Sequence, residues 1–273
     1  MAILKAALAF GLGLLALGGC ASKRVPAPQP RADACRAAVQ PAWSARRRVV
    51  HLARCEWIAF GRQRLLLDRG WPESQVDFGP DEDALSVWPR VAEYWDAADP
   101  RHAAEVRAAA ERAGSRELWP AWRRPWSAAF VSWVMRGAGL PDFTPDPAHS
   151  DYLRAALQRR PESVVDLADY TPVAGDVVCA GRGSGPRDAA EFLGRLREER
   201  GYFPSHCDIV VDVRSDALTL IGGNVKNAVT ATITSVVDGR IPPTTTRSWA
   251  VALRLGEPPD PCAALQPGPG CGP

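Results

Sequence analysis

The stretch RRPWSAAFVSWVMRGAGL, residues Arg123–Leu140, decides the fold. Its apolar residues recur at helical spacing and a glycine follows them, which predicts a helix from Trp126 to Gly137. Ser127 then lies at the start of this helix, beside backbone N–H groups that have no partner within it and at the positive end of its dipole. That position suits a nucleophile, because the same groups stabilise an oxyanion. It equally suits a serine that only caps the helix.

The segments before and after this helix differ in their periodicity. Further helices are predicted at 49–68, 89–97, 100–113, 148–159 and 186–200. Strands are predicted at 173–181, 206–213, 217–223, 229–237 and 248–255, joined by short turns that suggest an antiparallel meander. Because most of the helices come first and most of the strands come last, the sequence predicts an α+β fold with segregated layers.

The first residues of the chain are typical of a processing signal rather than of a folded domain. Residues 1–19 combine a short basic start with an apolar run too short to span a bilayer. The run ends in LALGGC, which resembles a bacterial lipobox and implies cleavage before Cys20 and acylation, as with palmitate, of its thiol. Because Ala21 is not an aspartate, the resemblance implies sorting to the outer membrane, facing the periplasm. Residues 20–31 would form a Pro-rich tether. The alternative to the lipobox is an ordinary secretory signal with a chance cysteine at position 20.

Composition argues against several classes of ligand. The net charge is +2 and the arginines are scattered along the chain, so no nucleic-acid partner is indicated. Neither a CxxC pair nor a His/Cys cluster occurs, so no metal site is expected. No phosphate-binding glycine motif accompanies the GGN segment, and no organic cofactor is implied.

The remaining cysteines predict disulfides. Of seven cysteines, six remain without the lipidated Cys20, and an even number in an exported protein favours disulfides over metal. Six cysteines allow many pairings, and order along the chain suggests Cys35–Cys55, Cys179–Cys207 and Cys262–Cys271. Of the three pairings, Cys179–Cys207 has the best structural support, because both residues fall in short strands that can lie side by side. An unpaired reactive thiol at Cys207, beside His206, is the alternative.

Three later segments line up with the helix start in a recognisable order. They are GDVVCAG at 175–181, SHCDIVVDV at 205–213 and LIGGNVKNAV at 220–229. The ordered set resembles the CHAP amidase/peptidase group of the NlpC-type, papain-like superfamily. There a Trp-Cys-Ala-Ala-Phe-Val helix start, a Gly-Asp strand, a His-led strand and a Gly-Gly-Asn segment recur together. The chain resembles more closely still a bacterial family known as domain of unknown function 2272.

This resemblance implies a division of the chain. A papain-like, CHAP-like domain with helices packed on a small antiparallel sheet would cover residues 123–256. A helical extension would precede it at 32–122, and a Pro/Gly/Cys-rich tail would follow at 257–273.

The resemblance also implies roles for individual residues. Ser127 takes the place of the nucleophilic cysteine, His206 that of the general base and Asn224 that of the group orienting the imidazole. A serine hydroxyl must lose its proton to the base as it attacks, whereas a thiol ionises more readily. Asp208 shares the strand face of His206, so it either replaces Asn224 or is a polar edge residue. Asp176 is expected to be a turn residue.

The clustered tryptophans have both a structural and a functional interpretation, whereas the remaining histidines have no functional one. Trp119, Trp122 and Trp126 either line a substrate groove, where they would stack on sugar rings, or pack in the core. The remaining histidines, His51, His102 and His149, are expected to be structural or solvated.

The resemblance and the lipid anchor together predict a cell-envelope hydrolase. It would cleave amide bonds of peptidoglycan peptides through Ser127, His206 and Asn224, with the membrane as its second partner. An alternative is a catalytically inactive module that uses the same cleft to bind wall peptide or a protein partner. A third is an envelope scaffold protein working through residues 32–122.

Overall fold

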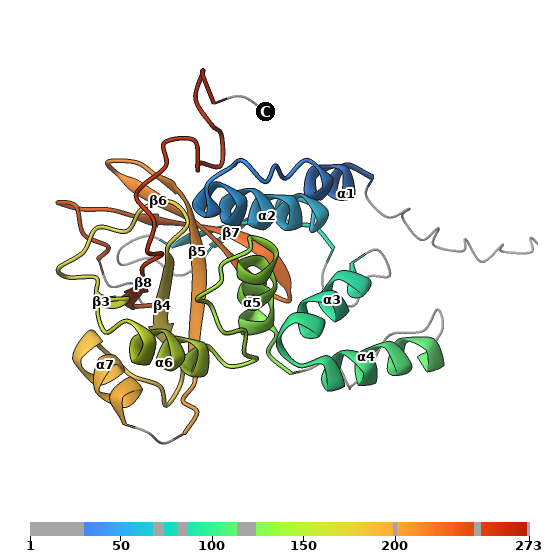
Figure 1. Cartoon of the computed structure of the whole chain (residues 1–273), viewed down its shortest axis with the longest axis horizontal. Coiled ribbons are helices and arrows are strands. Elements are labelled where there is room, and N and C mark those ends of the chain that lie inside the picture. The colour runs from blue at the N-terminus through green and yellow to red at the C-terminus, as the bar shows by residue number, and fades with distance from the viewer. Residues whose placement is uncertain are drawn as a thin grey trace, which may run out of the picture.

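The computed structural model of the chain describes residues 30–67, 74–80, 87–113, 124–198, 201–242 and 247–271. The predicted signal peptide, Cys20 with most of the tether, and Trp119 and Trp122 lie outside the described residues. The described part contains seven helices and one mixed eight-stranded sheet, which confirms the α+β class (Figure 1). Within it, no helix is long and apolar enough to cross a membrane.

The sheet places its strands in the order β2-β1-β7-β6-β5-β4-β8-β3. Neighbouring strands are antiparallel except β1 and β7, which are parallel. The meander β5-β6-β7 is therefore as predicted, whereas β8 returns to pair with β4 and β3. The strands are β1 Arg64–Leu67, β2 Ser74–Asp77, β3 Val164–Asp166, β4 Val177–Gly181, β5 Ser205–Val213, β6 Ala217–Val225, β7 Ala228–Ser235 and β8 Trp249–Leu253.

Helices cover one face of this sheet. The central helix α5 packs on β5 and β6 and is itself covered by α2 and α3, while α4 packs on α3 (Figure 1). Alternate residues of β5 face opposite sides, so Cys207 and Ile209 join the helical core and Val210 joins a smaller cluster on the other face. The helices are α1 Pro30–Ala37, α2 Ala45–Ala59, α3 Trp88–Ala98, α4 Pro100–Ala113, α5 Ser127–Gly137, α6 His149–Arg159 and α7 Ala189–Arg197.

The helix predicted at 49–68 extends further along the chain than the observed helix α2, Ala45–Ala59. In the structure it ends at Ala59, because Phe60 caps it and Gly61 follows with a left-handed φ of 77°. Residues Arg64–Leu67 then form β1, whose alternating burial fits a strand rather than a helix. The segment 32–122, expected to be a helical extension, thus also contributes β1 and β2 to the common sheet.

Disulfides and a buried ion pair cross-link the structure. The three disulfides suggested by chain order, Cys35–Cys55, Cys179–Cys207 and Cys262–Cys271, are all present. A buried ion pair joins Arg46 of α2 to Asp176 at 2.8 Å. The Asp176 carboxylate also accepts from the backbone N–H of Val173, so it acts as the turn residue that the sequence predicted.

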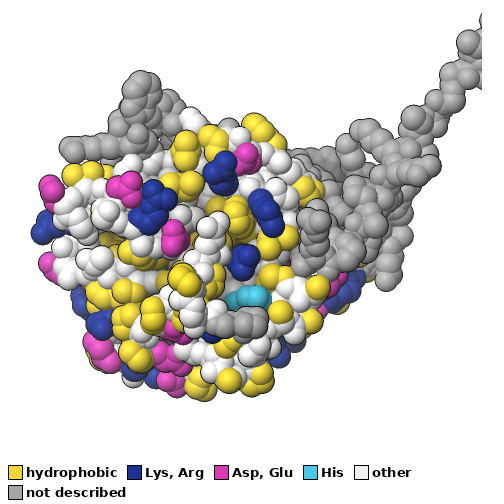
Figure 2. Space-filling model, turned by 90° about the horizontal axis from the view of Figure 1, so that it is seen from above, with side chains coloured by type: hydrophobic (Ala, Val, Ile, Leu, Met, Phe, Trp, Pro, Cys, Tyr) yellow, Lys and Arg dark blue, Asp and Glu magenta, His cyan; other side chains and the backbone are white. Residues whose placement is uncertain are grey.

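The surface above α1 and α2 mixes charges of both signs. Basic side chains there are interspersed with acidic and apolar ones rather than gathered into a stripe (Figure 2). The described residues on the face seen in Figure 2 therefore form no stripe of a single charge.

Candidate functional site

The N-termini of two helices bring Ser127 and His149 together. Ser127 is the first residue of α5, and His149 is the first residue of α6. The Oγ atom of Ser127 lies 2.7 Å from Nε2 of His149, which is hydrogen-bond distance. Both residues are almost fully buried, with 3% and 4% of their surface exposed. This distance and these groups are those that a nucleophile and its general base would require.

The other ring nitrogen of His149 is also engaged. Its Nδ1 atom lies 2.6 Å from the hydroxyl of Tyr152, one turn further along α6. When Nδ1 carries the proton and donates to Tyr152, Nε2 is free to accept the proton of Ser127. The Tyr152 hydroxyl can accept in this tautomer, which is the one that general-base catalysis requires.

The protonation states suit this role. Burial, followed by the nearby charges of His206 and Arg182, holds the pKa of His149 well below its ordinary value of 6.5. Burial, followed by the charge of Asp208, raises the pKa of Tyr152 well above 10.0. At neutral pH the site thus contains a neutral imidazole and a neutral phenol.

A second polar pair lies beside the first. Nε2 of His206 lies 2.7 Å from Oδ1 of Asp208, close enough for an ion pair although the atoms are not aligned as a hydrogen bond. Arg247 lies 3.2 Å from the other carboxylate oxygen. Burial lowers the pKa of His206, although the attraction of Asp208 opposes this effect. The rings of His149 and His206 meet edge to face, with centroids 5.8 Å apart.

Glycines of β6 make room for this packing. A Cβ atom on Gly222 would lie 1.7 Å from Oδ1 of Asp208, and one on Gly223 would lie 2.5 Å from Phe130 of α5. The first two residues of the GGN segment therefore let the buried carboxylate and the helix approach the strand.

The structure pairs the predicted residues differently from the resemblance. The hydrogen bond of Ser127 is to His149, which the sequence analysis expected to be structural or solvated, and not to His206. Within the described residues, the side chain of His206 lies against that of Asp208, which is fully buried rather than an edge residue. Asn224 lies at a bulge in β6 with a left-handed φ of 55°.

Trp126 belongs to the core rather than to a groove. It is fully buried, and its ring lies 6.0 Å from that of Phe60 and 5.7 Å from that of Tyr94. Of the three candidate tryptophans it is the one that the structure describes.

The Ser127–His149 pair opens onto a cavity of about 190 Å³. Residues from α3, α5, α6, the start of β5 and the segments that precede these elements contribute to its wall. Besides the pair, they include Trp95, Arg124, Ala128, Tyr202 and Ser205. The pair is therefore accessible to a small part of a larger substrate.

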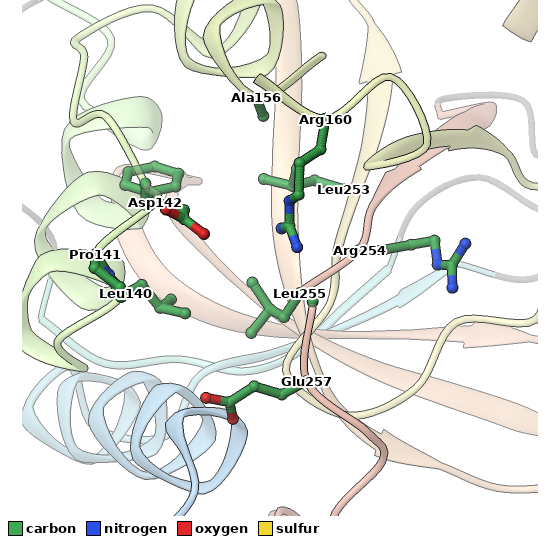
Figure 3. Close-up of a pocket in the computed structure, with 11 residues that line it drawn as sticks. Leu140, Pro141, Asp142, Ala156, Arg160, Leu253, Arg254, Leu255 and Glu257 are labelled. Carbon is green, nitrogen blue, oxygen red and sulfur yellow. The ribbon is translucent and has the colours of Figure 1, made fainter. Parts of the chain in front are cut away.

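A second cavity, of about 220 Å³, lies at the other end of α6. Arg160 and Leu255 project toward its centre from opposite elements, with Glu257 below them (Figure 3). Its described lining contains no serine, cysteine or histidine, so it offers no nucleophile–base pair. The catalytic candidate is therefore the cavity at the start of α6.

The fold and site define an α+β protein with a buried serine–histidine pair at a helix terminus. Residues 82–255 match the family model described as "Uncharacterized protein conserved in bacteria (DUF2272)", so the chain belongs to this family. The matched segment starts earlier than the predicted domain, which was expected to start at residue 123. It contains Ser127, His149 and His206. No curated protein and no solved structure matches the chain.

Proposed function

We propose that this protein is a serine amidohydrolase in which Ser127 is the nucleophile and His149 is the general base. The observation that carries the proposal is the 2.7 Å contact between Oγ and Nε2 at the wall of a cavity. In this proposal His149 takes the role that the resemblance gave to His206.

The first step follows from this geometry. Oγ of Ser127 attacks the carbonyl carbon of the substrate as its proton passes to Nε2 of His149. The carbonyl oxygen becomes an oxyanion, and the imidazole becomes an imidazolium whose Nδ1–H donates to the hydroxyl of Tyr152.

The start of α5 supplies groups that stabilise the oxyanion. The first N–H groups of a helix have no partner within it. Trp126, at the N-cap, gives them no side-chain hydrogen bond within the described structure. Ala128 lies in the cavity wall, so the N–H groups of this turn are next to the place where the oxyanion forms.

The cycle closes with water. The imidazolium returns its proton to the leaving amine as the C–N bond breaks, which leaves an ester on Ser127. His149 then takes a proton from a water molecule that attacks the ester, releasing a carboxylic acid and free Ser127. The net reaction is the hydrolysis of an amide, with no cofactor consumed.

The His206–Asp208 pair is proposed to support His149. The ring of His206 packs edge to face against that of His149. Asp208 provides a negative charge near the imidazolium that forms on His149. Removal of His206 should then slow the reaction without abolishing the attack of Ser127.

The substrate is proposed to be a peptide of the cell wall, and the protein an outer-membrane lipoprotein anchored through Cys20 and facing the periplasm. The lipobox-like LALGGC and the likeness to papain-like, CHAP-like amidases support this reading. Three disulfides are also typical of an oxidising compartment.

The proposal is tested with purified peptidoglycan. Released fragments are followed by mass spectrometry for the wild-type protein and for Ser127→Ala, Ser127→Cys, His149→Ala and His206→Ala. His51→Ala serves as the control, since His51 lies on α2 and is hydrogen-bonded to Cys35. Wild type and His51→Ala should release the same fragments, and Ser127→Ala and His149→Ala should release none. Cleavage by Ser127→Cys alone, or binding of peptidoglycan without cleavage by any variant, would contradict the proposal.

A further inference from the structure

Two residues that line the cavity beside Ser127 carry buried polar groups that lack partners within the described part of the chain. The indole Nε1 of Trp95 and the hydroxyl of Ser205 make no hydrogen bond within the described part of the chain. Both residues contribute to the cavity wall, and they are 2% and 9% exposed. We propose that these two groups bind the acyl side of the substrate, and that this acyl group is a peptide that offers carbonyl oxygens to them.

Unpartnered groups of this kind are costly in a folded protein. Most buried polar atoms have a hydrogen-bond partner, and a buried donor without one destabilises the folded state. A substrate in the cavity removes this cost when it supplies the missing partner. The same principle makes a polar site reject ligands that lack the matching group.

The two groups approach the site from different elements. Trp95 belongs to α3, which packs on α5, whereas Ser205 is the first residue of β5 and precedes His206. The Trp95 ring is held by an edge-to-face contact with His102 at 4.3 Å. The Trp95 indole is thus held by the fold before a substrate arrives, and the backbone of Ser205 is held in β5.

The chemistry of the groups defines the ligand. An indole N–H only donates, and so its partner in the substrate must be an acceptor. A serine hydroxyl can donate to a second acceptor. A peptide presents a carbonyl oxygen at every residue, while an alkyl acyl chain has none beyond the carbonyl that reacts. The inference rests on the proposed function, because it assigns the substrate of the same site.

The test compares the rates at which the full-length protein hydrolyses two activated esters. Acetyl-Ala-Ala p-nitrophenyl ester carries peptide carbonyls, and hexanoyl p-nitrophenyl ester does not. Trp95→Phe keeps a ring but removes the N–H, and Ser205→Ala removes the hydroxyl. Each variant should lower kcat/KM for the peptidyl ester by about tenfold and leave that for the hexanoyl ester within about twofold.

Ser163→Ala is the matched control. The hydroxyl of Ser163 is also buried and without a partner among the described residues, but Ser163 precedes β3 and does not contribute to this cavity. It should leave both rates unchanged. Equal losses for both esters in Trp95→Phe and Ser205→Ala, or no loss for either, would overturn the inference while leaving the hydrolase intact.

A binding measurement separates this inference from the proposed function. Acetyl-Ala-Ala amide is titrated into the Ser127→Ala protein by calorimetry, and then into the same protein with Trp95→Phe or Ser205→Ala added. Binding that weakens about tenfold in each double variant supports the inference even when the wild type hydrolyses nothing, in which case the proposed function fails alone. Absence of binding to Ser127→Ala would overturn the inference.

Discussion

Ser127 and His149 lie 22 residues apart in the chain, yet Oγ and Nε2 are 2.7 Å apart. Each residue begins a helix, so the positive ends of two helix dipoles meet at the site. This arrangement stabilises an oxyanion but disfavours an imidazolium. Burial, followed by the nearby charges of His206 and Arg182, holds the pKa of His149 well below 6.5 and so keeps the imidazole neutral. In the proposed reaction, the imidazolium formed during attack would depend on Tyr152 and on the nearby Asp208.

Tyr152→Phe should slow the reaction without preventing binding. The variant keeps the ring but removes the hydroxyl that lies 2.6 Å from Nδ1 of His149. Because this hydroxyl can accept from the Nδ1–H of the imidazolium and so stabilise it, we expect kcat to fall about tenfold and KM to stay within about twofold. Steady-state kinetics with a peptidyl ester measures both constants. A rise in KM with unchanged kcat would show that Tyr152 binds substrate instead of orienting His149.

The pH dependence of kcat/KM should show an acid limb below 6.5. The base must be neutral to accept the proton of Ser127, and the pKa of His149 is lowered, first by burial. Activity should therefore persist as the pH falls through 6.5, the value of an ordinary histidine, and decline only at lower pH. Initial rates between about pH 4 and pH 8 measure this limb. An acid limb centred above 6.5 would contradict the assignment of His149 as the base.

Much of the fold follows from local sequence patterns. The helix that begins at Ser127 has clear apolar periodicity, and the pairing of Cys179 with Cys207 follows from two strands that are short and close in sequence. Strand β1 could not be predicted in the same way, because it is only four residues long and its stability depends on pairing with β7. Its leucines also continue the apolar character of the preceding helix.

The site was harder to predict than the fold for a related reason. The resemblance placed a nucleophile at Ser127, but the partner of that residue depends on where α6 starts in space. His149 heads a helix in the sequence as Ser127 does, and this shared position is the signal that could have identified it. No local pattern shows that the two helix starts converge.

The buried pair of Arg46 and Asp176 should be essential for stability. The two side chains are 2% and 0% exposed, so Arg46→Ala would leave a buried carboxylate without its charge partner. We expect a loss of about 3–5 kcal/mol in the free energy of unfolding, measured by denaturant titration. Arg107→Ala is the control, because its pair with Asp96 is 42% and 45% exposed and should contribute less than about 1 kcal/mol. Equal losses in the two variants would refute this account of the core.

The central claim is that His149 activates Ser127, and covalent labelling tests it most directly. The protein is treated with diisopropyl fluorophosphate, and the rate and position of the adduct are determined by peptide mass mapping. We predict an adduct on Ser127 in the wild type, a labelling rate at least about 100-fold lower in His149→Ala, and a much smaller loss in His206→Ala. A wild-type protein that remains unlabelled at Ser127, or one labelled equally fast without His149, would contradict the claim.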